Sequence, residues 1–428
     1  MRSRPSLIAV VTLTLAAAVA CAPTTGPPGS PAPPPATAHH ATHLAVATAT
    51  SRQSPRELRA RFEQLLGQHT VIAVRLMRSV VAAAPDLRQA AVASLQENTH
   101  ALHQIVASAY GSAQADRFNQ LWEDHIADLF SYANGVASHN ESAKQTARAG
   151  LIAYCDAYGR WFAEASNGRV RASDAADGVR MHVEELIKQL DAYAARDYEQ
   201  AYRIEREAYE HMFTAGTTLA KASLTPEAAV GVDAAPQKLR SAFSMLLGEH
   251  MELIVDAQRA TFAGPSEFKA AAAQVNANTT ALTKAMGTIA GARKGAEFQT
   301  AWASHVEGLM GYTAAVAGKD DAAKAAAEQK MNTAVVSLAR YFSGVVKDKR
   351  AFVPLTTAIT QHDTHLSNQV NAYAAKDYTK AQQMAQEGYQ QMLGVADTLV
   401  DAIQRTVQKG QPVGGSQTGG GGTAHPSR

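Results

Sequence analysis

Apolar residues recur at three- and four-residue spacing through most of residues 54–408, and alanine is abundant throughout. Alternating runs of Val, Ile and Thr are absent from the sequence, so the pattern predicts helices rather than strands. Short breaks rich in Gly, Pro, Asn and Asp divide the first half into six predicted helices, over residues 54–84, 86–110, 113–138, 141–166, 174–195 and 197–223. Short connections favour antiparallel neighbours. The fold class is therefore all-α, either an up-and-down helical bundle or a four-helix bundle with an added hairpin.

The second half of the chain repeats the first at an offset of about 180 residues. Leu65-Leu66-Gly67-Gln68-His69 returns as Leu246-Leu247-Gly248-Glu249-His250, and Trp122-x-x-His125 returns as Trp302-x-x-His305. This period is too long for a solenoid unit and indicates domain duplication. We expect two tandem antiparallel bundles of about six helices each: module 1 over residues 54–224 and module 2 over residues 237–408. A linker with two prolines, residues 225–236, would join them.

The first 21 residues have the layout of a secretion signal. Arg2 and Arg4 precede an apolar stretch, Leu7 to Val19, which ends in Ala-Val-Ala-Cys at Cys21. This ending resembles a bacterial lipobox, so we expect Cys21 to be lipidated. The protein would then be anchored in the membrane on the outer face of the cell; the alternative is a secreted protein cut after the Ala-x-Ala site.

Low-complexity segments flank the two modules. Residues 22–53 contain seven prolines among small residues, which predicts a disordered tether that holds the modules away from the membrane. Residues 409–428 are rich in glycine and are expected to form a disordered tail. The net charge of +2 is not concentrated in any block, which argues against a nucleic-acid partner.

The two modules together contain eleven histidines, and three histidines of each module match a histidine of the other. His250, His305 and His362 of module 2 fall on histidines of module 1, whereas only a minority of positions agree overall. In module 1 each matched histidine replaces an apolar residue on the face of its helix that should point inward. The matched histidines of module 1 are His69, His125 and His182.

Distances from the predicted turns place these histidines at one level of the bundle. The same level of module 1 should contain Asn98, Cys155 and His211, with Met212 beside it. In module 2 the corresponding side chains are Asn278, Val335 and Gln391, with Met392 beside them. Trp122 and Trp302 lie one turn from a matched histidine and are further candidates for the site.

Three imidazoles from separate helices are a common way to bind a late transition metal such as copper or zinc. The soft side chains of Met212, Met392 and Cys155 would favour copper. A haem held by two axial histidines ranks below these metals, and the sequence has no C-x-x-C-H motif for covalent attachment. The motifs H-E-x-x-H and G-x-S-x-G and any phosphate-binding loop are also absent from the sequence, which argues against an enzyme.

The motif set resembles a family of bacterial exported helical repeat proteins labelled copper amine oxidase-like, for which the label does not establish an activity. The resemblance rests on the L-L-G-x-H start, the W-x-x-H motif and the run from Ala192 to Tyr198 with its copy at Ala372 to Tyr378. It implies a histidine–methionine pair, which His211-Met212 retains and Gln391-Met392 does not. Our leading hypothesis is a surface-anchored metal-binding protein for storage, scavenging or delivery. The alternative is a sensor, adhesion or scaffold lipoprotein whose histidines are purely structural.

Overall fold

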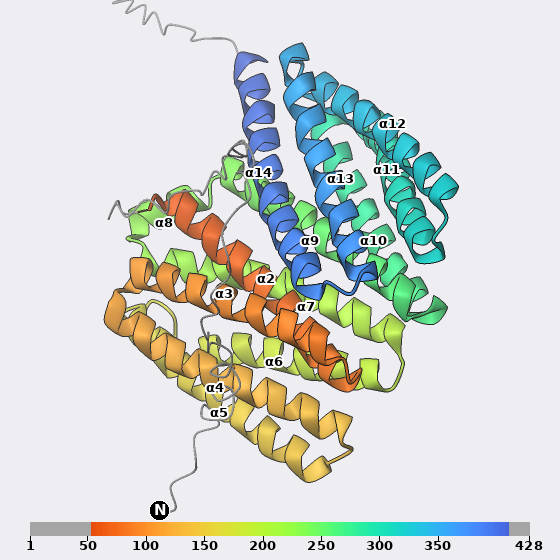
Figure 1. Ribbon diagram of the computed structural model, residues 1–428. Coiled ribbons are helices and arrows are strands. Elements are labelled where there is room, and N and C mark those ends of the chain that lie inside the picture. Colours follow the sequence, from red (N-terminus) through yellow and green to blue (C-terminus); the bar gives the residue numbers. More distant parts are fainter. Residues whose placement is uncertain (1–52, 411–428) are drawn as a thin grey trace, which may run out of the picture. The chain divides into compact units, whose positions relative to one another are not determined.

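The computed structural model describes residues 53–410, and this part of the chain contains 13 α-helices, one short 3₁₀ helix and no strand (Figure 1). The predicted all-α fold class is therefore confirmed. The expected signal segment, the lipidation site at Cys21, nearly all of the tether and most of the tail lie outside the described residues.

Six long helices make up the first half of the described chain, and their ends lie within three residues of the predicted ones. The only wide connection, between the fourth and fifth of them, contains Asn167 and Gly168 with positive φ. The helices are α2 (Pro55–Val81), α3 (Pro85–Tyr110), α4 (Ser112–Ala137), α5 (Glu141–Ala165), α6 (Ala172–Ala194) and α7 (Tyr198–Ser223).

The second half has the same order of six long helices, which is compatible with duplication. The segment expected as a linker contains the short helix α8 (Pro226–Val232), and a 3₁₀ turn (Lys349–Ala351) precedes the fifth long helix of this half. The long helices are α9 (Ala235–Ala263), α10 (Pro265–Ala290), α11 (Ala292–Gly318), α12 (Asp321–Val345), α13 (Phe352–Ala374) and α14 (Tyr378–Gly410).

Local sequence explains where the helices start. At the start of α2, Ser54 and Glu57 form a capping box, in which each side chain bonds the other residue's backbone N–H. Asn140 and Asp320 occupy the same position of the repeat, and each accepts a hydrogen bond from an N–H in the first turn of α5 or α12. Prolines at the first turns of α3 and α10 need no hydrogen-bond partner there.

The first long helix of each half is buried nearly all round rather than along one stripe. In α2 an unbroken run from Phe62 to Val74 is buried, and in α9 a similar run extends from Leu246 to Gln258. Helices that are covered on every side occupy the centre of a bundle. α2 contacts α3, α4, α6 and α7, and α9 contacts α10, α11, α13 and α14. Each half is thus a bundle around a central helix.

The two halves contact each other through matching elements. α7 packs on α10, and α14 packs on α3, so each half offers the same pair of positions to the other. The hydroxyls of Tyr209 and Tyr389, which are equivalent in the repeat, lie 3.0 Å apart. The Tyr209 hydroxyl also lies 3.4 Å from the carbonyl of Met245, and the Tyr389 hydroxyl lies 3.3 Å from that of Gln64, so the two hydroxyl protons are shared among three contacts. These reciprocal contacts indicate an approximate two-fold relation between the halves.

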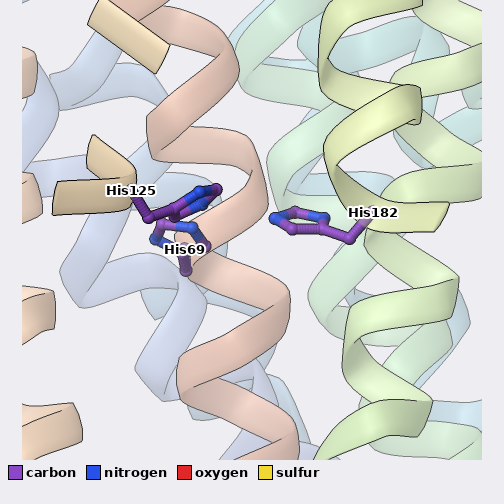
Figure 2. Close-up of side chains that lie close together, drawn as sticks. All are labelled: His69, His125 and His182. Atoms are coloured by element: carbon purple, nitrogen blue, oxygen red, sulfur yellow. The ribbon is translucent and has the colours of Figure 1, made fainter. Parts of the chain in front are cut away.

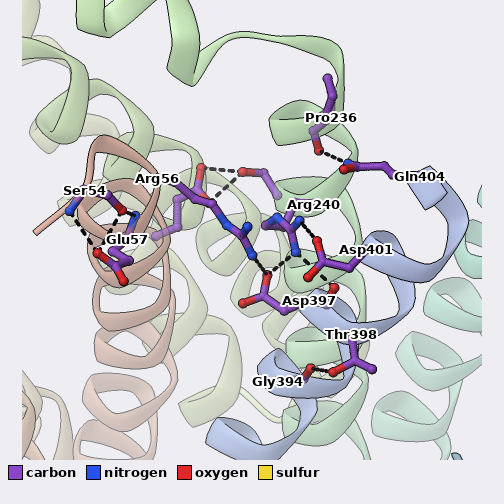
Figure 3. A network of polar contacts seen from close by, with 12 residues as sticks. Ser54, Arg56, Glu57, Pro236, Arg240, Gly394, Asp397, Thr398, Asp401 and Gln404 are labelled. Atoms are coloured by element: carbon purple, nitrogen blue, oxygen red, sulfur yellow. Dashed lines mark hydrogen bonds and ion pairs between the residues drawn. The ribbon is translucent and has the colours of Figure 1, made fainter. Parts of the chain in front are cut away.

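Buried charges also join the halves. Arg75 of α2 lies 2.8 Å from Asp256 and 2.8 Å from Glu252, both on α9, and the three side chains are at most 8% exposed. A second, partly exposed polar cluster lies mainly within the second half, where Arg240 of α9 bonds Asp397 and Asp401 of α14; Arg56 of α2 approaches Asp397 from the first half at 3.6 Å (Figure 3). None of the helices within residues 53–410 combines the length and the apolar character needed to cross a membrane.

We predict that Arg75→Met destabilises the protein by about 3–5 kcal/mol, because it leaves Asp256 and Glu252 buried without their cation. The reversed pair, Arg75→Asp with Asp256→Arg, should recover part of this loss, since the guanidinium introduced on α9 would again face carboxylates on both helices. Urea unfolding followed by circular dichroism measures both changes.

The control is Arg203→Met, which removes an ion pair whose two side chains are about half exposed and should cost about 0–1 kcal/mol. Equal effects of the Arg75 and Arg203 variants would contradict a structural role for the buried pair.

Candidate metal sites

Three histidines from three helices converge in the core of the first half. His69 lies on the central helix α2, His125 on α4 and His182 on α6, and all three are at most 1% exposed. One ring nitrogen from each lies within 4.8 Å of the others. Figure 2 shows the three rings turned toward one another, with His182 facing the other two from across the gap. We call this set triad 1.

The second half has the same arrangement at the equivalent positions. His250 lies on the central helix α9, His305 on α11 and His362 on α13, and all are at most 2% exposed. Their ligand nitrogens also lie within 4.8 Å of one another. We call this set triad 2. These two groups are the clusters of metal-binding side chains found within the described residues.

The spacing of the rings is close to that of three imidazoles on one metal ion. With bonds of about 2.0–2.1 Å, and a ring centre about 1.1 Å beyond each nitrogen, ring centres around one ion lie about 5.2–5.5 Å apart. The ring centres are separated by 5.5, 5.6 and 5.7 Å in triad 2 and by 5.7, 6.0 and 6.0 Å in triad 1. The ring positions are therefore compatible with coordination of one metal ion by each triad, once the nitrogens, which lie within 4.8 Å of one another, turn toward it.

Most of the triad ring nitrogens have no hydrogen-bond partner within the described structure. Both nitrogens of five of the six histidines, and Nδ1 of His305, are buried without a hydrogen-bond partner. A buried polar group left unsatisfied costs about 1–3 kcal/mol. Because a folded domain is stable by only about 5–15 kcal/mol, this many unsatisfied groups would consume most of its stability. A bound metal ion would satisfy one nitrogen of each ring at once.

Burial also keeps the imidazoles in the form that binds metals. Desolvation lowers the pKa of His125 to about 3 and that of His305 to about 4. The pKa values of the other four triad histidines are lowered well below the usual value, first by burial and then by the neighbouring imidazoles. All six rings are therefore uncharged at neutral pH, and only an uncharged imidazole can donate its lone pair to a metal.

Aromatic side chains close the triads from one side. The Trp122 ring lies 4.3 Å from that of His69, and Trp302 lies 4.6 Å from His250. The tryptophan of the W-x-x-H motif thus packs against the triad histidine of the central helix, and the histidine of the motif is itself a member of the triad. The tryptophans pack beside the candidate ligands and are not metal ligands themselves.

The L-L-G-x-H motif combines three functions on the central helix. Leu65 and Leu66 pack in the core of the first half, and His69 enters the triad. The glycine makes room for the tyrosines at the junction: a Cβ at Gly67 would lie 3.0 Å from the Tyr209 ring, and one at Gly248 would lie 2.7 Å from the Tyr209 hydroxyl. The motif therefore places a triad histidine two residues after a glycine that lies at the contact between the halves.

The two asparagines expected at the same level support the central helix. Asn98 donates to the carbonyl of Leu65 at 3.0 Å, and Asn278 donates to that of Leu246 at 2.9 Å. Each of these carbonyls lies one turn before a triad histidine. The asparagine side chains thus fix the helix that carries the ligand.

The other expected ligands lie around the triads rather than among them. Cys155 is fully buried in the core of the first half but is not part of the group whose ligand atoms converge. Met212 and His211 line a cavity of about 320 Å³ together with His182. Met392 is buried in the core of the second half. His211 bonds Glu185 at 3.1 Å and is only partly buried.

Two residues beside the triads were not anticipated from the sequence. Tyr154 stacks on His125 with ring centres 4.5 Å apart, and Ala334 stands at the equivalent position of the second half. Asp363 lies 3.4 Å from Nδ1 of His305, where the first half has Val183. Burial raises the pKa of Asp363 and lowers that of His305, so this contact joins uncharged groups and is not an ion pair. Because neither residue is retained in the other half, comparison of the two halves could not detect them.

Protein-family models, curated proteins and solved structures offer no match to this chain. The chemistry of the site is therefore argued from its own residues. Two buried groups of three uncharged imidazoles, with converging and otherwise unpartnered nitrogens, can each hold a metal ion.

We predict that the metal-free protein loses stability steeply below pH 6.5. There the unfolded chain binds protons at its histidines while the folded chain does not, so each triad histidine costs about 1.4 kcal/mol per pH unit until its folded pKa is reached. For His125 this window runs from pH 6.5 down to about 3. Urea unfolding at pH 7.5, 6.0 and 5.0 in the presence of a chelator measures the slope.

The variant His125→Leu cannot titrate at this position and should show a slope smaller by about 1.4 kcal/mol per pH unit. His103→Leu, which removes a partly exposed histidine outside the triads, is the control for the loss of a histidine as such. Identical slopes for the wild type and His125→Leu would show that His125 is already protonated in the folded state.

Proposed function

We propose that this protein binds two late transition metal ions, one in each histidine triad, and that it serves in metal storage, scavenging or delivery. The observation that carries the proposal is the convergence of three buried imidazoles in each half, most of whose nitrogens lack hydrogen-bond partners. Zinc, copper and related metals are the ions that imidazole binds best. The repetition of the arrangement in both halves supports a shared ligand rather than a chance cluster.

Copper in its reduced form, Cu(I), is our first choice of metal. Triad 1 consists of imidazoles alone and is surrounded by apolar and aromatic side chains. No negatively charged ligand of triad 1 would neutralise a bound ion. The free-energy cost of moving the ion from water into this apolar core is far higher for a divalent ion than for a monovalent one. Zinc sites usually contain a fourth ligand. A Cu(I) ion with three ligands fits triad 1 in both respects, because it has a single positive charge and needs no fourth ligand.

Storage or transfer fits the site better than catalysis. The triad histidines are at most 2% exposed, so a bound ion would be shielded from solvent and from large substrates. The depressed pKa values make these imidazoles poor proton acceptors near neutral pH. We further propose, from the lipobox-like sequence at Cys21 and the proline-rich stretch after it, that the protein acts outside the cell membrane, anchored by lipid or secreted.

We predict that the folded protein binds two Cu(I) ions per chain. Titration under reducing conditions against a chromophoric chelator, followed by elemental analysis, measures the stoichiometry. The variant His69→Ala/His125→Ala/His182→Ala should bind one ion, because triad 2 remains. At a free concentration one hundred times the dissociation constant, each bound ion should stabilise the fold by about 2.7 kcal/mol.

The matched control is His100→Ala/His103→Ala/His139→Ala, which removes three histidines of the same half that lie outside the triad and should still bind two ions. Circular dichroism of each metal-free variant shows whether it is folded. A folded wild-type protein that binds neither Cu(I) nor Zn²⁺ in stoichiometric amount would refute the proposal.

A further inference from the structure

Each triad has a fourth, partly exposed histidine beside it. We propose that His211 and His365 are uptake ligands, which bind the metal at the surface and pass it to triad 1 and triad 2, respectively. This inference rests on the proposed metal binding and adds the path by which an ion reaches a buried site. The side chains of His211 and His365 are 18% and 23% exposed, whereas the triad histidines are at most 2% exposed.

In the first half, a cavity connects the uptake ligand with the triad. It has a volume of about 320 Å³ and lies between α6, α7 and the aromatic residues of α4 and α5. Its lining includes His211, Met212, His182 and Trp122, so a partly exposed imidazole and a triad imidazole face the same space. Met212 adds a thioether, which is a soft ligand suited to Cu(I).

In the second half, helical spacing brings the two histidines together. His365 follows His362 by three residues on α13, and residues at this spacing are neighbours on one face of a helix. The corresponding groove of this half, about 880 Å³, is lined by Gln391 but not by His362. This groove does not reach His365 either, so in the second half the path from the surface to triad 2 is argued from the spacing of the two histidines along α13.

The pKa values agree with this proximity. Burial and then His69, His125 and His211 lower the pKa of His182. Burial and then His305 and His365 lower the pKa of His362.

A carboxylate accompanies each uptake ligand. Nδ1 of His211 bonds Glu185 at 3.1 Å, and Nδ1 of His365 lies 3.9 Å from Glu387. A carboxylate at one ring nitrogen makes an imidazole a better ligand through the other nitrogen, and its negative charge attracts a cation. In His211 this hydrogen bond leaves Nε2 for a metal, whereas the longer separation at His365 leaves either nitrogen.

The two halves place this pair on opposite helices. In the first half the carboxylate is on α6 and the histidine on α7, whereas in the second half the histidine is on α13 and the carboxylate on α14. Glu185 and His365 occupy equivalent positions of the repeat, and Gln391 stands where the first half has His211. The same combination of groups is therefore present at both sites although neither histidine is retained from one half to the other.

A buried triad needs such a ligand because a hydrated ion cannot enter it directly. Moving a bare charge from water into a protein core costs several kcal/mol unless it is coordinated at every stage. An imidazole between solvent and core can replace the first water molecules before the triad replaces the remainder. The uptake ligand should therefore change how fast an ion moves and leave the final affinity unchanged.

The experiment measures Cu(I) transfer from a chromophoric chelator by stopped-flow absorbance, in chains that keep a single triad. The variant His250→Ala/His305→Ala/His362→Ala retains triad 1, and His69→Ala/His125→Ala/His182→Ala retains triad 2. We expect His211→Gln to slow uptake roughly tenfold in the first background, the change that a barrier higher by about 1.4 kcal/mol produces. His365→Gln should do the same in the second background.

Release to a stronger chelator should slow by the same factor, because the bound state itself does not change. The control is His103→Gln, which removes a partly exposed histidine that is also paired with a carboxylate, Asp116, and belongs to neither triad. It should leave both rates unchanged.

Unchanged rates in the His211 and His365 variants would overturn the uptake role while leaving the proposed function intact. A loss of affinity or stoichiometry in these variants would also overturn it, since it would make them resident ligands. If neither background takes up Cu(I) although the metal-free proteins are folded, the proposed function fails and this inference fails with it.

Discussion

The structure buries six uncharged imidazoles in its helical cores, where most of their nitrogens have no hydrogen-bond partner. A buried histidine usually forms hydrogen bonds, and leaving its nitrogens unpaired costs free energy that a marginally stable domain cannot spare. The central helices α2 and α9 carry one such residue each, and four surrounding helices supply the others. A common metal ion in each triad would satisfy one nitrogen of each ring and so remove part of this cost, which means that the proposed metal binding would also stabilise the fold.

The contact between the halves shows how a duplicated chain can stabilise one arrangement. Positions 75 and 256 are equivalent in the repeat and meet across the junction, so identical residues there would place like charges together. The chain has Arg75 in one half and Asp256 in the other, which turns repulsion into a buried ion pair. Tyr209 and Tyr389 remain identical, since a hydroxyl can both donate and accept. The Arg75–Asp256 pair forms only when the first half contacts the second, because two copies of the same half would bring like charges together. The tyrosine pair is compatible with either arrangement.

Much of this architecture could be predicted from the sequence, because helical periodicity and internal repetition are local signals. Distances from the turns placed His69, His125 and His182 at one level, and the structure brings them together. The same reasoning placed Cys155 there, but height along a bundle does not fix the direction of a side chain. Asn98 turns to a backbone carbonyl instead, and the central position of α2 depends on packing among helices distant in sequence.

The differences between the halves follow a physical order. The triad histidines and the two tryptophans beside them are the same in both halves. The residues around them differ: Tyr154 of the first half is replaced by Ala334 in the second, and Val183 is replaced by Asp363. The ring spacing differs as well, with triad 2 already closer to that of a coordinated ion. If each triad holds a metal ion as proposed, the ion constrains only its ligands and their immediate supports. Different surroundings around the same ligands would then tune affinity and exchange separately at each site, so that the two sites of one chain would be unequal.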